Sequence, residues 1–339
     1  MWIVKESINV IMSKFFQYAV AVALLFVGLG VFAQEKTQAY YDTHESEILP
    51  DAQVAFLEGS YDRAAELCKW HYIIVGDNRA DELRDKAERC AKLTLEMNTL
   101  LAAGQNDAVR EKVRAVLALN PEDKNAKDVY ASIPSTGVIN GHEWVDLGLP
   151  SGLKWATCNL GASKPEASGS YFAWGETKPK SEYRWENYKF HESGSSAKES
   201  RLTKYGTGEE NGVVDNKTRL DPEDDAVRAD WGGSWRMPTK EEQDELRAEC
   251  IWSLATQGGT KGYMVTSKVN GNSIFLPAVG YRFGTDSHSD EYFGAYWSSS
   301  LYPEPGYSSL AYELYLSSET VGWGYHRRED GLAVRPVSE

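Results

Sequence analysis

The sequence has 339 residues and a formal net charge of −14, because 50 acidic side chains outnumber 36 lysines and arginines. A chain this acidic repels nucleic acids and anionic membrane surfaces, so we expect neither as a partner. The length suits two domains.

Residues 1–33 have the pattern of an export signal. Lys14 precedes an apolar stretch from Ala19 to Phe32, and Ala33 ends it with a small residue that a signal peptidase accepts. The stretch is short for a bilayer span, although an uncleaved anchor is the alternative. We therefore expect an exported protein in the periplasm, on the outer surface or secreted, with no membrane span after cleavage.

Residues 34–132 have the composition of α-helices, with Ala, Leu, Glu, Lys and Arg dominant. Val109, Val113 and Val116 recur at the spacing of one helical face. Asn120-Pro121 predicts the end of that helix. These residues indicate a helical domain.

This region also resembles a degenerate tetratricopeptide repeat. Gly59 and Gly104 stand where that family turns between helices, and Asn120-Pro121 resembles the end of its repeat. The spacing of the two glycines departs from the family period of about 34 residues. A plain helical bundle is the alternative. The resemblance implies a surface for protein–protein contact.

The chain has four cysteines, and none belongs to a C-x-x-C pair, which argues against a zinc or thioredoxin-like site. An exported protein meets an oxidising compartment, where disulfides persist. Two cysteines lie in each half of the mature chain. We therefore expect disulfide candidates at Cys68–Cys90 and Cys158–Cys250, with four buried free thiols as the alternative.

Residues 133–141 break the helical pattern with Pro, Gly and Ser, which predicts a linker. All but two of the eleven tryptophans lie beyond it, and glycine becomes frequent. This composition favours short strands joined by turns and long loops, so we expect residues 142–339 to form a second domain. The predicted fold class is α+β: a helical repeat-like domain, then a mixed α/β domain rich in short strands and loops.

The second domain contains one strong helix signal and several strand signals. Thr239, with Glu242 three residues later, has the capping-box pattern of a helix that runs to about Cys250. Asn270-Gly271 predicts a hairpin turn. The expected strands are 144–147, 153–158, 170–175, 263–269, 273–280, 295–300, 311–316 and 332–337.

Ordered motifs in this domain carry a family resemblance. They are Glu143–Gly152, Trp155–Asn159, Tyr171–Glu176, Trp235–Thr239, Phe275–Ala278, Tyr296–Ser300 and Val334–Val337. In this order they resemble the Fibrobacter succinogenes major paralogous domain over nearly all of residues 140–337. That family in turn is similar to the C-type lectin-like fold, including the variable domains made by diversity-generating retroelements. The resemblance implies a stable core under a displayed ligand-binding surface.

A stretch rich in Tyr and Ser near the C-terminus is the candidate ligand-binding surface. Tyr supplies a large contact area at little cost in rotamer freedom, and Ser and Gly adapt to a ligand. The resemblance places the displayed surface in the same region. The alternative is that strand alternation turns half of the rings inward. The candidate residues are Tyr302, Tyr307, Tyr312, Tyr315, Trp323, Tyr325 and His326.

The acidic run 221–225 is the candidate for a Ca²⁺ site, since calcium prefers clustered oxygen ligands. Asp221, Asp224 and Asp225 would supply them. A solvated loop or a helix cap is the alternative. The ligand triplets of sugar-binding C-type lectins are absent from the sequence, so we expect no cofactor.

The sequence has no pattern typical of an enzyme active site. The Trp235–Thr239 motif is similar to one in formylglycine-generating enzymes, but these need a reactive cysteine pair near the C-terminus, and no cysteine follows Cys250. The six histidines lack metal-ligand spacing. We therefore expect a binding protein, not an enzyme, for a protein, peptide or glycan at the cell envelope or outside. The alternatives are an envelope scaffold that acts through the helical repeat, and an enzyme of unknown reaction.

Overall fold

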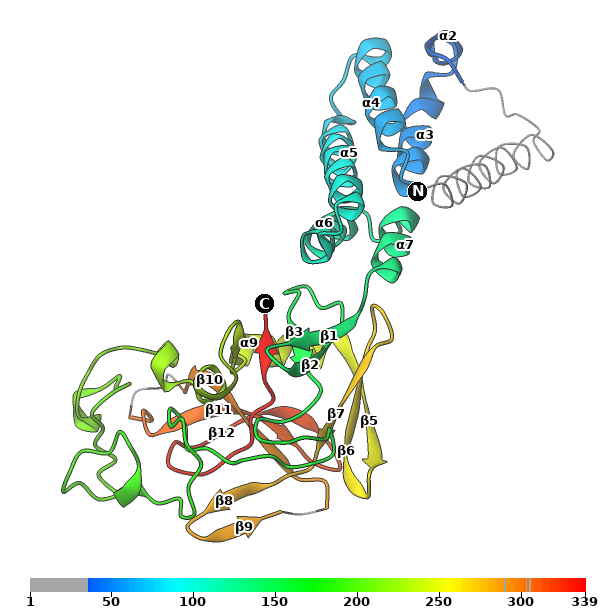
Figure 1. Cartoon of the computed structure of the whole chain (residues 1–339). Coiled ribbons are helices and arrows are strands. Elements are labelled where there is room, and N and C mark those ends of the chain that lie inside the picture. Colours follow the sequence, from blue (N-terminus) through cyan, green and yellow to red (C-terminus); the bar gives the residue numbers. More distant parts are fainter. Residues whose placement is uncertain (1–35, 290, 303, 305) are drawn as a thin grey trace, which may run out of the picture. The chain divides into compact units, whose positions relative to one another are not determined.

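The computed structural model describes residues 36–289, 291–302, 304 and 306–339 (Figure 1). The predicted export signal lies outside these residues. The chain is of the α+β class, with helices in its N-terminal half and sheets in its C-terminal half, as predicted. It divides into two compact units: the described residues up to Leu95 with Leu119–Lys124, and Glu96–Ala118 with Asn125–Glu339. Within the described part, no helix combines the length and the apolar character that a membrane span needs.

The first unit is built from α2 (Gln38–Tyr41), α3 (Glu45–Leu57), α4 (Tyr61–Val75) and the start of α5 (Asp81–Ala102). Gly59 has a left-handed backbone, with φ +79°, and makes the predicted turn from α3 to α4. Asn120 is fully buried, and its amide donates to the Phe56 carbonyl in the last turn of α3, 2.8 Å away. The Asn-Pro turn therefore caps the end of α3.

The second unit begins with helices. In α6 (Asn106–Leu119) the side chains of Val109, Val113 and Val116 are buried, which confirms the predicted helical face and its end before Asn120. The next helix is α7 (Lys124–Ser132).

Asp146 of β2 (His142–Asp146) joins these helices to the first sheet. One carboxylate oxygen pairs with Nε of Arg110 in α6 at 2.8 Å, and the other accepts a hydrogen bond from the Tyr130 hydroxyl of α7 at 2.9 Å. Asp146 and Arg110 are both buried, and breaking a buried ion pair is strongly destabilising. The compact unit that carries the sheets therefore includes these two helices.

Strand β1 (Thr136–Ile139) lies inside the segment 133–141 that the sequence predicts to be a linker. It pairs with β2 through a turn at Asn140 and Gly141, both with positive φ. A Cβ at Gly137 would lie 2.8 Å from the Trp144 ring, so the bare glycine makes room for this ring. The linker prediction is wrong for β1, because a glycine that resembles a helix breaker in sequence is a packing position in a hairpin.

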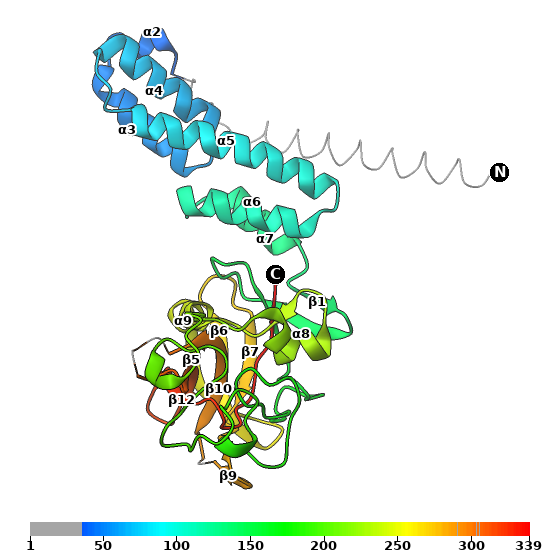
Figure 2. The ribbon, with the colours of Figure 1, turned by 90° about the vertical axis from the view of Figure 1, so that its left-hand side faces the viewer.

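The first sheet has the strand order β1-β2-β3-β13-β4. Strands β3 (Lys154–Ala156) and β13 (Val337–Ser338) pair, so the start and the end of the sheet-forming segment meet. β4 (Trp235–Arg236) pairs with the other edge of β13. Figures 1 and 2 show the red carboxyl-terminal end of the chain at this sheet.

Further sheets follow along the chain. One has the order β5-β6-β7, formed by β5 (Cys250–Gln257), β6 (Thr260–Ser267) and β7 (Ser273–Pro277). Another has the order β10-β11-β12, formed by β10 (Gly294–Leu301), β11 (Leu310–Leu316) and β12 (Val321–Arg327). Between them, β8 (Tyr281–Phe283) pairs with β9 (Asp286–His288). The helices of this part are α8 (Ala226–Trp231), α9 (Lys240–Glu249) and the 3-10 turns η1 (Trp185–Asn187), η2 (Glu209–Asn211) and η3 (Pro222–Asp224).

The local predictions for this part are confirmed only in part. The Thr239 hydroxyl accepts from the Glu242 amide at the start of α9, as the capping-box pattern predicts. The predicted strand 170–175 is only an isolated bridge between Phe172 and Leu332. The predicted strand 332–337 is reduced to β13, and β5 is not predicted as a strand.

Buried side chains lie on both faces of β10. Trp297 packs in a cluster with Trp174 and Trp235, whereas its neighbour Tyr296 packs in a cluster with Trp155. Successive side chains of a strand point to opposite faces, so one strand serves both clusters. The Trp297 indole also donates to the Phe172 carbonyl at 2.7 Å, and this hydrogen bond fixes the irregular segment around Phe172.

All four cysteines are free thiols in the structure, so the predicted disulfides are not formed. Cys250 is buried among apolar side chains, while Cys158 is half-exposed in a pocket beside His142. Cys68 and Cys90 are both buried, but they have different neighbours. Their order along the chain carries no information on these environments, which is why the predicted pairing is wrong.

Candidate ligand-binding surface

The sheet β10-β11-β12 positions most of the predicted binding residues. β11 and β12 are antiparallel, with Tyr312 opposite Tyr325 and Leu314 opposite Trp323. Directly paired residues share one face of a sheet, and residues two apart along a strand do so as well. The Tyr312, Trp323 and Tyr325 rings therefore lie on the same face.

Tyr302, just after β10, is at the centre of these rings. Its ring centre is 4.8 Å from that of Tyr325, 5.3 Å from that of Tyr312 and 6.0 Å from that of Tyr307. The Tyr312 and Trp323 rings meet edge to face at 5.6 Å. We call this set the aromatic surface: Tyr302, Tyr307, Tyr312, Trp323 and Tyr325.

The aromatic surface is open to solvent although its rings contact each other. Tyr307, Trp323 and Tyr325 are 53%, 48% and 51% exposed. Exposed large rings are unfavourable in water, and a contiguous patch of them marks an interaction site. Because the rings already pack against one another, they would lose little side-chain entropy when a ligand binds.

Two predicted residues lie elsewhere. Tyr315 and His326 are on the opposite face of the same strands, as the alternation along β11 and β12 requires. The Tyr315 ring packs against Phe293 at 5.5 Å. His326 Nδ1 lies 2.8 Å from an Asp330 carboxylate oxygen. For these two candidate residues, the alternative that strand alternation turns the rings away from the binding face therefore applies.

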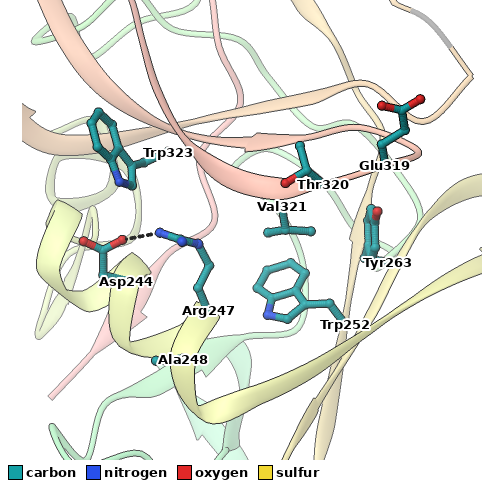
Figure 3. A pocket seen from close by; sticks show the side chains of 9 residues that line it. All are labelled: Asp244, Arg247, Ala248, Trp252, Tyr263, Glu319, Thr320, Val321 and Trp323. Atoms are coloured by element: carbon teal, nitrogen blue, oxygen red, sulfur yellow. Dashed lines mark hydrogen bonds and ion pairs between the residues drawn. The ribbon is translucent and has the colours of Figure 1, made fainter.

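A groove of about 660 Å³ adjoins the aromatic surface at Trp323 (Figure 3). Figure 3 shows the Trp252 ring below Val321, and the Trp323 ring beside the Asp244–Arg247 pair. The lining residues come from α9, from β5 and β6, and from the β11–β12 hairpin: Asp244, Arg247, Ala248, Trp252, Tyr263, Glu319, Thr320, Val321 and Trp323.

Charges at the junction of groove and rings are mostly paired. Arg247 donates to Asp244 at 2.6 Å, and Lys240 also pairs with Asp244. The Lys240 ammonium lies 5.2 Å from the centre of the Trp323 ring. Two cations thus flank Asp244, with Glu319 at the far side of the groove. The site offers rings and hydrogen-bonding groups without a large excess of one charge.

The part of this site that α9 supplies is not predicted from the sequence. Lys240, Asp244 and Arg247 are four and three residues apart, the spacing of one helical face, so a scan for charged faces would find them. Trp252 and Tyr263 give no such signal, because the strand β5 that brings Trp252 to the groove is not predicted.

The acidic run is arranged differently from a calcium site. Asp225 accepts from the backbone amides of Val227 and Met237, at 2.8 and 2.9 Å, and caps α8. Asp225 therefore acts as a helix cap, which is the alternative interpretation of the acidic run, and it is not among the three residues whose oxygens cluster.

Asp221 and Asp224 do lie together, with Glu223 as a third neighbour. The Lys204 ammonium is 2.6 Å from a carboxylate oxygen of each aspartate. Hydrogen bonds from Lys204 and Lys217 hold the pKa of Asp221 below its usual range. Lysine ammonium groups thus supply the positive charge that a calcium ion would bring.

Comparison of the chain with protein-family models, with curated proteins and with solved structures finds no match. The function proposed for the chain is therefore inferred from the geometry of the site.

Proposed function

We propose that this chain is an exported binding protein whose second unit, with a C-type lectin-like fold, captures a ligand on the aromatic surface. The fold assignment draws on the ordered tryptophan and proline motifs of residues 143–337. The observation that carries the function is that five rings from three separate segments meet on one exposed face.

The ligand class that this surface favours is a glycan, peptide or protein, and not a polyanion. Ring faces stack on sugar or peptide groups, while Lys240, Asp244 and Arg247 provide polar partners at the edge. The chain carries a net charge of −14, which opposes nucleic acids and other polyanions. No reaction is assigned, because the groove holds no nucleophile with an adjacent base among the residues that line it.

The test is a glycan and peptide array probed with the wild type and with Trp323→Ala. Trp323 is 48% exposed but contacts Lys240 and Tyr312, so its removal should lower the thermal unfolding midpoint by only a few degrees and leave the chain folded. We expect array binding to fall about tenfold or more, since tryptophan is among the residues that most often carry the binding energy of an interface. The matched control is Phe283→Ala, which removes a 42% exposed ring outside the aromatic surface. Equal binding by the wild type and both variants would rule out the aromatic surface as the binding site.

A second candidate function is an envelope scaffold that acts through the first unit. The observation that favours it is an exposed apolar pair on α4, Tyr72 and Ile73, which are 58% and 65% exposed. Replacing both by Ser in the full chain should then abolish partner binding, while Trp323→Ala leaves it intact.

A further inference from the structure

The face of β11 and β12 opposite the aromatic surface carries a buried acidic cluster, formed by Glu313, His326, Glu329 and Asp330. The three carboxyl residues are only 3–4% exposed. Glu313 pairs in register with Gly324, where a Cβ would lie 2.9 Å from the Glu313 carboxylate. The missing side chain of Gly324 therefore makes the room that Glu313 occupies.

The cluster has more carboxylate oxygens than donors. His326 Nδ1 lies 2.8 Å from one oxygen of Asp330. Among the residues that the structure describes, Glu313 Oε2, Glu329 Oε2 and Asp330 Oδ1 are buried without a hydrogen-bond partner. An unpaired buried carboxylate is strongly unfavourable, so this cluster needs protons or a cation to neutralise it.

The geometry favours protons over a chelated metal ion. Three metal-type ligand atoms come within 4.8 Å of one another only at Asp221, Glu223 and Asp224, within the described part of the chain. The acidic cluster is thus too spread out for one ion to bind three of its side chains. Burial raises the pKa of Glu313 and that of Glu329 to about 7. Burial opposes a charged His326, but the Asp330 hydrogen bond and the nearby carboxylates outweigh it and raise the pKa of His326.

The groups around the acidic cluster do not compensate its excess of carboxylate oxygens over hydrogen-bond donors. Tyr281 of β8 lies over His326, with ring centres 4.3 Å apart, and stacks on His288 of β9 at 4.9 Å. β10 contributes the uncharged Trp297 ring, 6.4 Å from His326. Arg327 and Arg328 lower the pKa of Glu329, but their effect is smaller than that of burial.

We propose that the acidic cluster is a proton-operated switch beneath the aromatic surface. When protonated, it holds β11 against β12; when deprotonated, it loosens the two strands that display Tyr312, Trp323 and Tyr325. The Glu313–Gly324 register pair lies between the Tyr312–Tyr325 and Leu314–Trp323 pairs, so a change at Glu313 reaches both. The inference rests on the proposed function, because it assigns a regulation to that binding surface.

The test is hydrogen–deuterium exchange of the full chain at about pH 5.5 and about pH 8, corrected for the intrinsic chemical rate. In the wild type, protection of residues 310–327 should fall about tenfold at the higher pH, while that of residues 260–277 stays constant. Glu313→Gln imitates the protonated acid and should keep its protection at both pH values. The control Glu186→Gln changes an exposed glutamate and should behave like the wild type.

Equal protection at both pH values in the wild type would overturn the switch. A loss of protection at the higher pH in Glu313→Gln as large as that of the wild type would also overturn it. If Glu313→Gln does not fold, Glu329→Gln and the wild-type titration decide the question in the same way. The measurement needs no ligand. Its failure would therefore leave the array result intact, and failure of the array would leave this result intact.

Discussion

The ammonium of Lys240 lies 5.2 Å from the centre of the Trp323 ring. Lys240 is the first residue of α9 and Trp323 belongs to β12, so this contact joins the helix to the edge of the aromatic surface. A cation over an indole face is attracted by the ring quadrupole. The position of the Trp323 ring is thus coupled to the position of α9.

Replacing Lys240 by Met should therefore lower the free energy of unfolding by about 1 kcal/mol, from the lost ring contact and the lost ion pair with Asp244. Urea unfolding measures it. Lys178→Met is the matched control, because Lys178 is an exposed lysine, and it should change stability by less than about 0.5 kcal/mol. Equal effects of the two substitutions would show that the Lys240–Trp323 contact is not stabilising.

Replacing Arg328 should lower the free energy of unfolding far more than replacing Lys240. Its guanidinium is fully buried and donates to the Tyr188 hydroxyl at 2.9 Å and to the Ser308 carbonyl at 3.0 Å. Arg328→Met leaves these acceptors unpaired, so we expect a loss of about 3 kcal/mol or more. Arg327→Met, at the exposed neighbour, should cost less than about 0.5 kcal/mol. If urea unfolding showed only a small loss of stability in Arg328→Met, the hydrogen bonds of its buried guanidinium would not be stabilising.

The free thiols predict a pattern of chemical labelling. Burial raises the pKa of Cys68 and that of Cys250 to about 11, and Cys90 is fully buried as well. A thiolate is the reactive form, so these three should react slowly with iodoacetamide in the folded protein. The half-exposed Cys158 should react first, and all four should react in denaturant without a reductant. Failure of a pair to react in denaturant would instead indicate a disulfide.

Stability should depend on pH in a defined window. Burial raises the pKa of Glu313 from 4.5 to about 7, so the folded state binds a proton there that the unfolded state has lost. The stabilisation is complete below about pH 4.5 and is lost as the pH rises through about 7. The difference in urea stability between the wild type and Glu313→Gln should therefore change in favour of Glu313→Gln across this window. A constant difference would contradict the raised pKa.

Local sequence signals predict the structural features that are determined by residues close together in the chain. The valine spacing of α6, its end before Asn120 and the Thr239 capping box are all set within one or two helical turns. Five of the seven candidate ligand-binding residues lie on the aromatic surface, and they are predicted from a composition rich in Tyr and Ser that is visible in the sequence.

Features that depend on pairing across the fold were not predictable in this way. Tyr315 and Tyr312 look alike in sequence, but the register of β11 against β12 places them on opposite faces. The pairing of β10 with β11 also has a register shift between Trp297 and Leu301, which no local sequence pattern predicts. The cysteine environments also depend on tertiary packing, which is why spacing misled the disulfide prediction.

Fluorine NMR of protein labelled with fluorotryptophan would show whether a ligand binds on the aromatic surface. The Trp323 resonance is assigned by its loss in Trp323→Phe. On addition of the strongest array ligand, we expect this resonance to shift, while those of the buried Trp155 and Trp174 stay in place. A ligand that shifts the Trp70 or Trp231 resonance and leaves that of Trp323 unchanged would show that binding occurs away from the aromatic surface.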